Sequence, residues 1–147
     1  MTTGERVDPY LGFRFLVEID ALLVAGFHAV EGLEMELETE EYEEGGVNHH
    51  THVLPRRLTY PNLTLQRGLT DSDELWNWIA ASIHGTSDRK NGRIVLLDST
   101  GTEAAAWEFR DGYPVRWEGP EFAADDGGVA VETLEIAHHG IRKLDVG

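Results

Sequence analysis

Residues 38–68 of the chain, ETEEYEEGGVNHHTHVLPRRLTYPNLTLQRG, contain the pattern around which the fold is organised. The segment starts at the end of an acidic strand, is interrupted by Gly45-Gly46, crosses a polar stretch with histidines and turns at Pro55 before a second strand. A connection of this length inside a compact domain usually has a function or is disordered. We therefore predict a loop over about residues 40–57 that becomes ordered by contact with other copies of the same chain.

The residues that lead into this loop alternate strictly between apolar side chains and carboxylates. Leu33, Met35, Leu37 and Thr39 alternate with Glu34, Glu36, Glu38 and Glu40. A helix would scatter the glutamates around its axis, whereas a strand places them all on one face. The pattern predicts a strand over 33–39 with one apolar face on the core and a row of carboxylates on the other, which in a monomer would face water.

The rest of the chain reads mostly as short strands separated by turn residues. We expect the chain to break at Asp111-Gly112 and its tail to fray from Gly140 onward. The expected strands are 13–19, 22–30, 63–68, 94–97, 103–109, 113–117, 121–124 and 129–137.

One segment has helical spacing instead, from about residue 72 to 84. Its apolar residues recur every three or four positions, candidate N-cap residues precede them, and Gly85 follows as a C-terminal cap. Together these elements predict a single mainly β domain over residues 1–147, a β-sandwich or partly closed barrel with one flanking helix.

Charge and composition exclude several classes of function. The chain has 27 acidic and 12 basic residues, a formal charge of −15, which argues against direct, specific binding of nucleic acid. No run approaches the ~20 apolar residues of a membrane span, and the start has no signal-peptide pattern. The chain has no cysteine and only two lysines, Lys90 and Lys143. An excess of acids with few lysines indicates a proteome adapted to high salt, because concentrated salt screens the repulsion between acidic side chains on the surface.

Residues with catalytic or metal-binding chemistry do not form a recognisable site. His50 and His52 would share a face of an extended chain, but a third ligand is missing and Arg56-Arg57 follow, so we expect no metal. No carboxylate pair adjoins a positioned hydroxyl or histidine, and we expect neither an enzyme nor a cofactor. The alternative is a monomeric β-sandwich module that binds a ligand through its four tryptophans, Trp76, Trp78, Trp107 and Trp117.

The order of several short motifs resembles one family. They are Asp8-Pro9-Tyr10, the run from Phe13 to Asp20, Ala25-Gly26-Phe27, Glu31-Gly32-Leu33-Glu34, Glu41-Tyr42-x-Glu-Gly-Gly-x-Asn48, Leu54-Pro55-Arg56, Leu63-Thr64-Leu65-x-Arg67-Gly68, Leu75-Trp76-x-Trp78, Leu96-Leu97-Asp98, Pro114-x-x-Trp117 and Gly119-Pro120. In this order and spacing the sequence is similar to the tail tube proteins of contractile phage tails and contractile injection systems, over nearly the whole chain.

The resemblance implies a structural protein whose copies form hexameric rings stacked into a tube. The implied partners are a contractile sheath, a baseplate with a spike, terminator proteins, and a cargo of protein or DNA in the lumen. Such a particle would be assembled in the cytoplasm and could be released outside the cell, and the sequence leaves phage tail and injection system open. The expected contacts between subunits or rings are Glu40, Glu41, Tyr42, Glu43, Glu44, Gly45, Gly46, Asn48, Pro55 and Arg56, and the expected lumen-facing acids are Glu34, Glu36 and Glu38.

Overall fold

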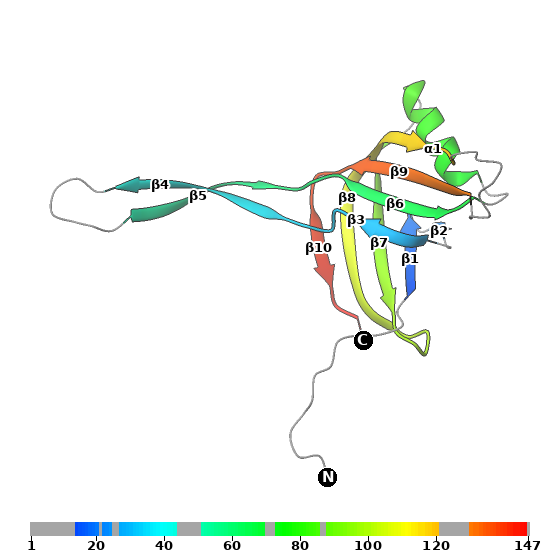
Figure 1. Ribbon diagram of the computed structural model, residues 1–147, viewed down its shortest axis with the longest axis horizontal. Coiled ribbons are helices and arrows are strands. Elements are labelled where there is room, and N and C mark those ends of the chain that lie inside the picture. The colour runs from blue at the N-terminus through cyan, green and yellow to red at the C-terminus, as the bar shows by residue number, and fades with distance from the viewer. Residues whose placement is uncertain are drawn as a thin grey trace, which may run out of the picture.

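The computed structural model describes residues 14–20, 22–24, 27–43, 51–69, 73–85, 88–120 and 130–146. Figure 1 shows a compact body from which one two-stranded arm projects. The elements are β1 (Arg14–Ile19), β2 (Leu22–Val24), β3 (Phe27–Glu31), β4 (Glu36–Glu43), β5 (Thr51–Thr59), β6 (Leu63–Gly68), α1 (Glu74–Ile83), β7 (Lys90–Leu97), β8 (Glu103–Glu118), β9 (Val131–Ala137) and β10 (Ile141–Leu144).

The body is an antiparallel sheet folded into two layers. Its strands follow the order β2-β1-β7-β8-β9-β6-β3, and β10 pairs with β8. The first half of β8 pairs with β7 and β10, and its second half pairs with β9. The two layers therefore share β8, and their strands cross in Figure 1. The sheet does not close into a barrel, and the predicted mainly β fold with one helix is confirmed.

Strand β8 passes from one layer to the other where we expected the chain to break. Asp111 has a positive φ of 53°, and a Cβ on Gly112 would lie 2.5 Å from the Phe109 ring. The residues that suggested a turn therefore bend one continuous strand of 16 residues. The expected fraying after Gly140 is also wrong, because β10 is held by its pairing with β8.

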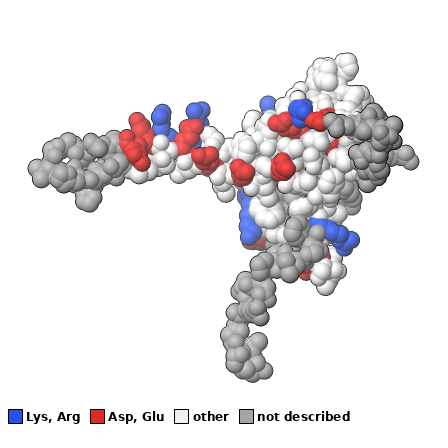
Figure 2. Space-filling view, in the orientation of Figure 1, with Lys and Arg blue, Asp and Glu red and all other residues white. Residues whose placement is uncertain are grey.

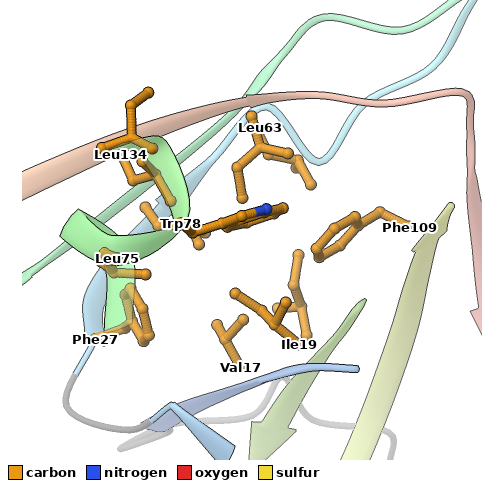
Figure 3. Close-up of a cluster of buried hydrophobic side chains, with 12 residues drawn as sticks. Val17, Ile19, Phe27, Leu63, Leu75, Trp78, Phe109 and Leu134 are labelled. Atoms are coloured by element: carbon orange, nitrogen blue, oxygen red, sulfur yellow. The ribbon is translucent and has the colours of Figure 1, made fainter. Parts of the chain in front are cut away.

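The core lies between the layers and is closed by the helix. Figure 3 shows Trp78 at its centre, between side chains of both layers and beside Phe109. Every second residue of β6 and β9 is buried, as the period of a strand facing a core requires. Helix α1 lies within the predicted range of 72–84 and buries Leu75, Trp78 and Ile79.

A buried ion pair joins β6 to β9 in the second layer, and its arginine also reaches the helix. The side chains of Arg67 and Glu132 are each only 3% exposed, and Arg67 Nε lies 3.3 Å from Glu132 Oε2. Arg67 Nη2 also donates to Glu74 Oε2 on α1 at 3.2 Å. The other oxygen of Glu132 accepts a hydrogen bond from Trp117 Nε1 at 3.1 Å. Both charges are thus compensated, which a buried pair requires.

We predict that Arg67→Ala lowers the free energy of unfolding by about 3–5 kcal/mol, because it leaves the Glu132 carboxylate buried without its cation. The matched control is Arg116→Ala, whose exposed pair with Glu118 is worth at most about 1 kcal/mol. Urea denaturation followed by circular dichroism measures both. Equal losses in the two variants would contradict the role given to the buried pair.

Candidate interaction surface

The arm is an antiparallel ribbon of β4 and β5. Its register runs from Glu36 opposite Thr59 to Glu43 opposite Thr51, with one irregularity between Leu37 and Thr39. The loop predicted over 40–57 is therefore wrong for 40–43 and 51–57, which are paired strands.

Physical reasons for this difference lie in the residues of β5. Thr51, Val53 and Thr59 favour extended backbone, and strand pairing satisfies their backbone groups. Pro55 lies opposite Thr39 next to the irregularity. A two-stranded ribbon consists only of edge strands, where the missing N–H of proline is tolerated. The sequence suggested a loop because Gly45-Gly46 interrupts the acidic segment, a polar stretch follows and Pro55 indicates a turn.

The alternating segment 33–39 is placed differently from the prediction. Strand β4 starts only at Glu36, and Leu33 packs against the core of the body. Met35 and Leu37 are 62% and 52% exposed. Met35 and Leu37 were expected to face the core, but the chain leaves the body after Leu33 and both side chains are exposed.

One face of the arm is apolar. Residues opposite each other in an antiparallel pair share a face, and alternate residues follow them. Leu37 lies opposite Leu58, Thr39 opposite Pro55, and Glu41 opposite Val53. We call Leu37, Val53, Pro55 and Leu58 the apolar face of the arm. Leu37, Val53 and Leu58 are 52%, 56% and 45% exposed, so these side chains remain in water in the isolated chain.

The other face of the arm is charged. By the same alternation Glu36, Glu38 and Glu40 of β4 lie on this face with the two arginines of β5, whereas Glu41 is on the side of Leu37. Arg57 Nε lies 3.5 Å from Glu38 Oε2, and Arg56 Nε lies 3.9 Å from Glu40 Oε2. These exposed pairs are worth little each. Figure 2 shows the basic side chains standing along one edge of the arm and acidic ones along the other.

Most of the predicted contact residues map to this arm. Glu40, Glu41, Tyr42 and Glu43 lie on β4, and Pro55 and Arg56 lie on β5. Glu44, Gly45, Gly46 and Asn48 lie outside the described residues. Of the three predicted lumen acids, Glu36 and Glu38 are on β4 and Glu34 precedes it. Only Glu40 and Arg56 of the predicted contact set are brought together as an ion pair among the described residues.

The root of the arm is fixed to the body by contacts that the sequence did not reveal. Gly32 has φ +91°, and a Cβ there would lie 2.1 Å from the carbonyl oxygen of Asn62. His138 Nδ1 accepts a hydrogen bond from the N–H of Gly140 at 3.1 Å. Its Nε2 therefore carries the proton and donates to the carbonyl of Pro61 at 3.0 Å. These contacts hold both ends of the ribbon against the second layer.

A second surface feature lies on the body between α1 and the end of β8. It is a hollow of about 470 Å³ lined by Leu69, Asp73, Trp76, Trp117 and Glu132. Trp78 belongs to the core instead, so the four tryptophans do not line one pocket. Trp78 is 6% exposed and Trp76 is 50% exposed, so these two tryptophans are divided between the core and the surface.

Among the described residues no cluster of three or more histidines and carboxylates could hold a metal ion. His50 is outside the described residues. The described helix is too short and too polar to cross a membrane.

Comparison with known proteins identifies a family. The family model of the T4-like virus tail tube protein gp19 matches residues 11–142. No curated protein matches the chain.

Solved structures give the same result. A chain in the cryo-EM structure of the anti-feeding prophage (AFP) baseplate aligns with TM-score 0.83 and 26% identity, over 95% of this chain and 97% of that one. A chain of the sheath-tube complex of the extracellular contractile injection system PVC, in its extended state, aligns with TM-score 0.82 and 25% identity, over 94% and 93%. Hcp1 from Flavobacterium johnsoniae shares the fold, with TM-score 0.55 and 14% identity over 88% and 94%.

Proposed function

Because the chain belongs to the T4-like virus tail tube protein gp19 family, we propose that it is the inner tube subunit of a contractile injection system or contractile phage tail. Copies form hexameric rings, and the rings stack into a tube. The observation that carries this proposal is the apolar face of the arm, which the described body does not cover. A two-stranded ribbon is at best marginally stable alone in water, so contact with another copy gives this face the burial it lacks.

The relatives support the proposed partners. The matching chains come from a baseplate and from a sheath-tube complex, and further chains of this fold come from a tube terminating cap and a sheath/tube terminator. We therefore assign a contractile sheath, a baseplate with its spike, and terminator proteins as partners. The particle assembles in the cytoplasm and acts as a phage tail or as a released injection system.

The role of the chain in this particle is mechanical. The sheath drives the tube through a target envelope, and a protein or DNA cargo passes through the lumen. Neither step requires a reaction at the subunit, so the chain is a structural component and not an enzyme.

We predict that disrupting the arm gives a folded monomer that no longer polymerises. Two variants test this: deletion of Glu43–Val53, and the double substitution Leu37→Glu and Leu58→Glu. The substituted side chains are 52% and 45% exposed, so the body should keep its melting temperature within a few degrees. Negative-stain microscopy and size-exclusion chromatography measure assembly.

The control for this experiment is Ile83→Glu, which removes a 75% exposed apolar side chain from the end of α1 and should leave the tubes intact. Tubes formed by both arm variants would overturn the proposal. Wild-type protein that remains a compact particle of 16.4 kDa at all concentrations would favour the ligand-binding module instead.

We further propose that the protein works in high salt, because 27 acids oppose 12 bases and only two of the bases are lysines. The melting temperature of the arm-deleted monomer should rise with KCl well above about 0.15 M, as the Debye length falls from ~8 Å toward ~3 Å at 1 M. The monomer is used so that assembly does not contribute. A melting temperature that stays flat above physiological salt would contradict adaptation to salt.

We also propose that Glu34, Glu36 and Glu38 face the lumen, where they repel acidic or nucleic-acid cargo and so favour its passage. Reversing all three to lysine should slow cargo release or change cargo loading, measured by the amount of cargo retained in purified particles. Asp145→Lys, an exposed reversal away from the arm, is the control. Unchanged loading and release in tubes that carry the triple reversal would count against this placement.

A further inference from the structure

The link between β9 and β10 lies beside the root of the arm in Figure 1, and His138 begins this link. Its Nε2 donates to the carbonyl oxygen of Pro61 at 3.0 Å, and its Nδ1 accepts the N–H of Gly140 at 3.1 Å. Pro61 lies between β5 of the arm and β6 of the body. One imidazole ring thus ties the β9–β10 link to the segment through which the arm enters the body.

The His138 ring can make both bonds only while it is neutral. A backbone N–H always donates, so Nδ1 must keep its lone pair toward Gly140. Protonation of Nδ1 turns this acceptor into a donor and takes the partner away from the N–H of the buried Gly140, which is unfavourable. The ring must then rotate away from Gly140, and this rotation also breaks its bond to Pro61.

Tyr60 couples the His138 ring to the arm. The centroids of the two rings are 5.6 Å apart, and a Cβ on Gly140 would lie 3.4 Å from the Tyr60 hydroxyl oxygen. Tyr60 directly follows the last residue of β5. His138 and Gly140 therefore both pack against the end of the arm, and rotation of the His138 ring loosens this packing.

The charged groups around this joint do not favour a proton on His138. Titratable and charged side chains on the surrounding elements are Glu31 and Glu34 before β4, Tyr60, Arg110 and Asp111 of β8, Glu135 of β9, His139, and Arg142 of β10. Glu135 accepts a hydrogen bond from Asn62 at 3.0 Å, and Asp111 faces His139 at 3.2 Å. Among the described residues, His138 has no ion-pair partner that would stabilise its charged form.

His139 has the opposite requirement for a proton. Its Nδ1 lies 3.2 Å from Asp111 Oδ2, and this contact becomes an ion pair only when the ring is charged. Two backbone bonds of the link to β8 involve no titratable group: the His139 N–H donates to the Arg110 carbonyl at 2.8 Å, and the Arg110 N–H donates to the Gly140 carbonyl at 3.0 Å. Acid therefore favours the contact of the link with the body while it removes the contact of the link with the arm.

We propose that His138 is a proton-sensitive latch at the root of the arm. The neutral ring holds the arm in one direction relative to the body, and the protonated ring releases the arm while β10 remains paired with β8. Because histidine changes charge between about pH 5 and 8, the latch is closed at the upper end of this range and opens as the pH falls. All of these contacts lie within one chain, so the latch does not depend on the proposed tube function.

Hydrogen exchange of the Gly140 amide in the full-length protein measures the latch, at about pH 7.5 and about pH 5.5, with each rate expressed as a protection factor. Protection of Gly140 should fall at least ~10-fold at the lower pH, because its acceptor is lost. The amide of Leu65 in β6, a strand paired on both sides, is the internal control and should keep its protection. Equal protection of Gly140 at the two pH values, or an equal loss at Leu65, would overturn the proposal.

Two substitutions separate the two bonds of the His138 ring. Asparagine can accept the N–H two residues further along the chain, as in an Asx turn, but its amide does not titrate, so His138→Asn should keep the protection of Gly140 equal at the two pH values. His138→Gln, whose longer amide reaches toward Pro61 instead, should lower this protection ~10-fold already at the higher pH. His139→Asn is the matched control and should keep the wild-type fall in acid. A fall that persists in His138→Asn, or disappears in His139→Asn, would assign the effect to another group and contradict the latch.

Release of the arm needs a measurement of its own. Spin labels on Arg57→Cys in β5 and Thr100→Cys in the turn between β7 and β8 report the distance from arm to body, and the chain has no other cysteine. Labelled chains are diluted with unlabelled chains, so that only distances within one molecule are measured. The distance distribution should be broader at the lower pH, and it should be the same at both pH values when His138→Asn is added. A distribution that does not change with pH in the labelled chain with His138 would refute release of the arm.

Discussion

A two-stranded ribbon has no second layer with which to cover an apolar face, and the architecture of this protein depends on that constraint. The body solves the same problem internally: its sheet folds over at β8 and closes on a core with α1. The arm has no such layer, and Leu37, Val53 and Leu58 stay about half exposed. Burial of these three side chains can contribute favourable free energy only when another molecule covers them.

The folded body fixes the position of the arm. At the root, Gly32 fits against the backbone of Asn62 where no other residue could, and His138 bonds to the carbonyl of Pro61. On the far side, Arg67 pairs with Glu132 within the second layer and with Glu74 on α1, and the second pair ties the helix to the sheet. Rigid connections at both places mean that the direction of the arm and the position of the hollow are set by one folded core.

Two elements with a clear local pattern were predicted correctly, whereas the alternating segment 33–39 was not. The strand 63–68 and the helix within 72–84 follow from local patterns, because each has a face on the core. Two features depend on distant pairing and were missed. The tail after Gly140 contains Arg142 and Lys143 and has no apolar pattern, yet β8 supplies its hydrogen bonds. Asp111 and Gly112 are turn residues by composition, and only the crossing of two layers explains why they bend a strand.

For the candidate site, the sequence located the arm but not its conformation, and it did not reveal the hollow beside α1. Gly45-Gly46 and the polar stretch after them indicated a loop, and the strand form follows from the register of Glu41 with Val53 and of Glu43 with Thr51. The hollow could not be predicted, since Leu69, Asp73, Trp76 and Trp117 approach one another only when β6, α1 and β8 are in place. Trp76 was the one local signal, an aromatic residue in a helix whose buried face already contains Leu75 and Trp78.

The ribbon form of the arm changes the energetics expected of assembly. A loop that becomes ordered only on contact loses backbone freedom at that moment, at about 1–2 kcal/mol per residue. In the paired segments of β4 and β5 this cost falls mainly on folding of the subunit, so more of the contact energy is left for association. The exposed pairs of Arg56 and Arg57 with glutamates hold these side chains in place only weakly. A preorganised arm that leaves its apolar face accessible is suited to the repeated, identical contacts of the proposed tube.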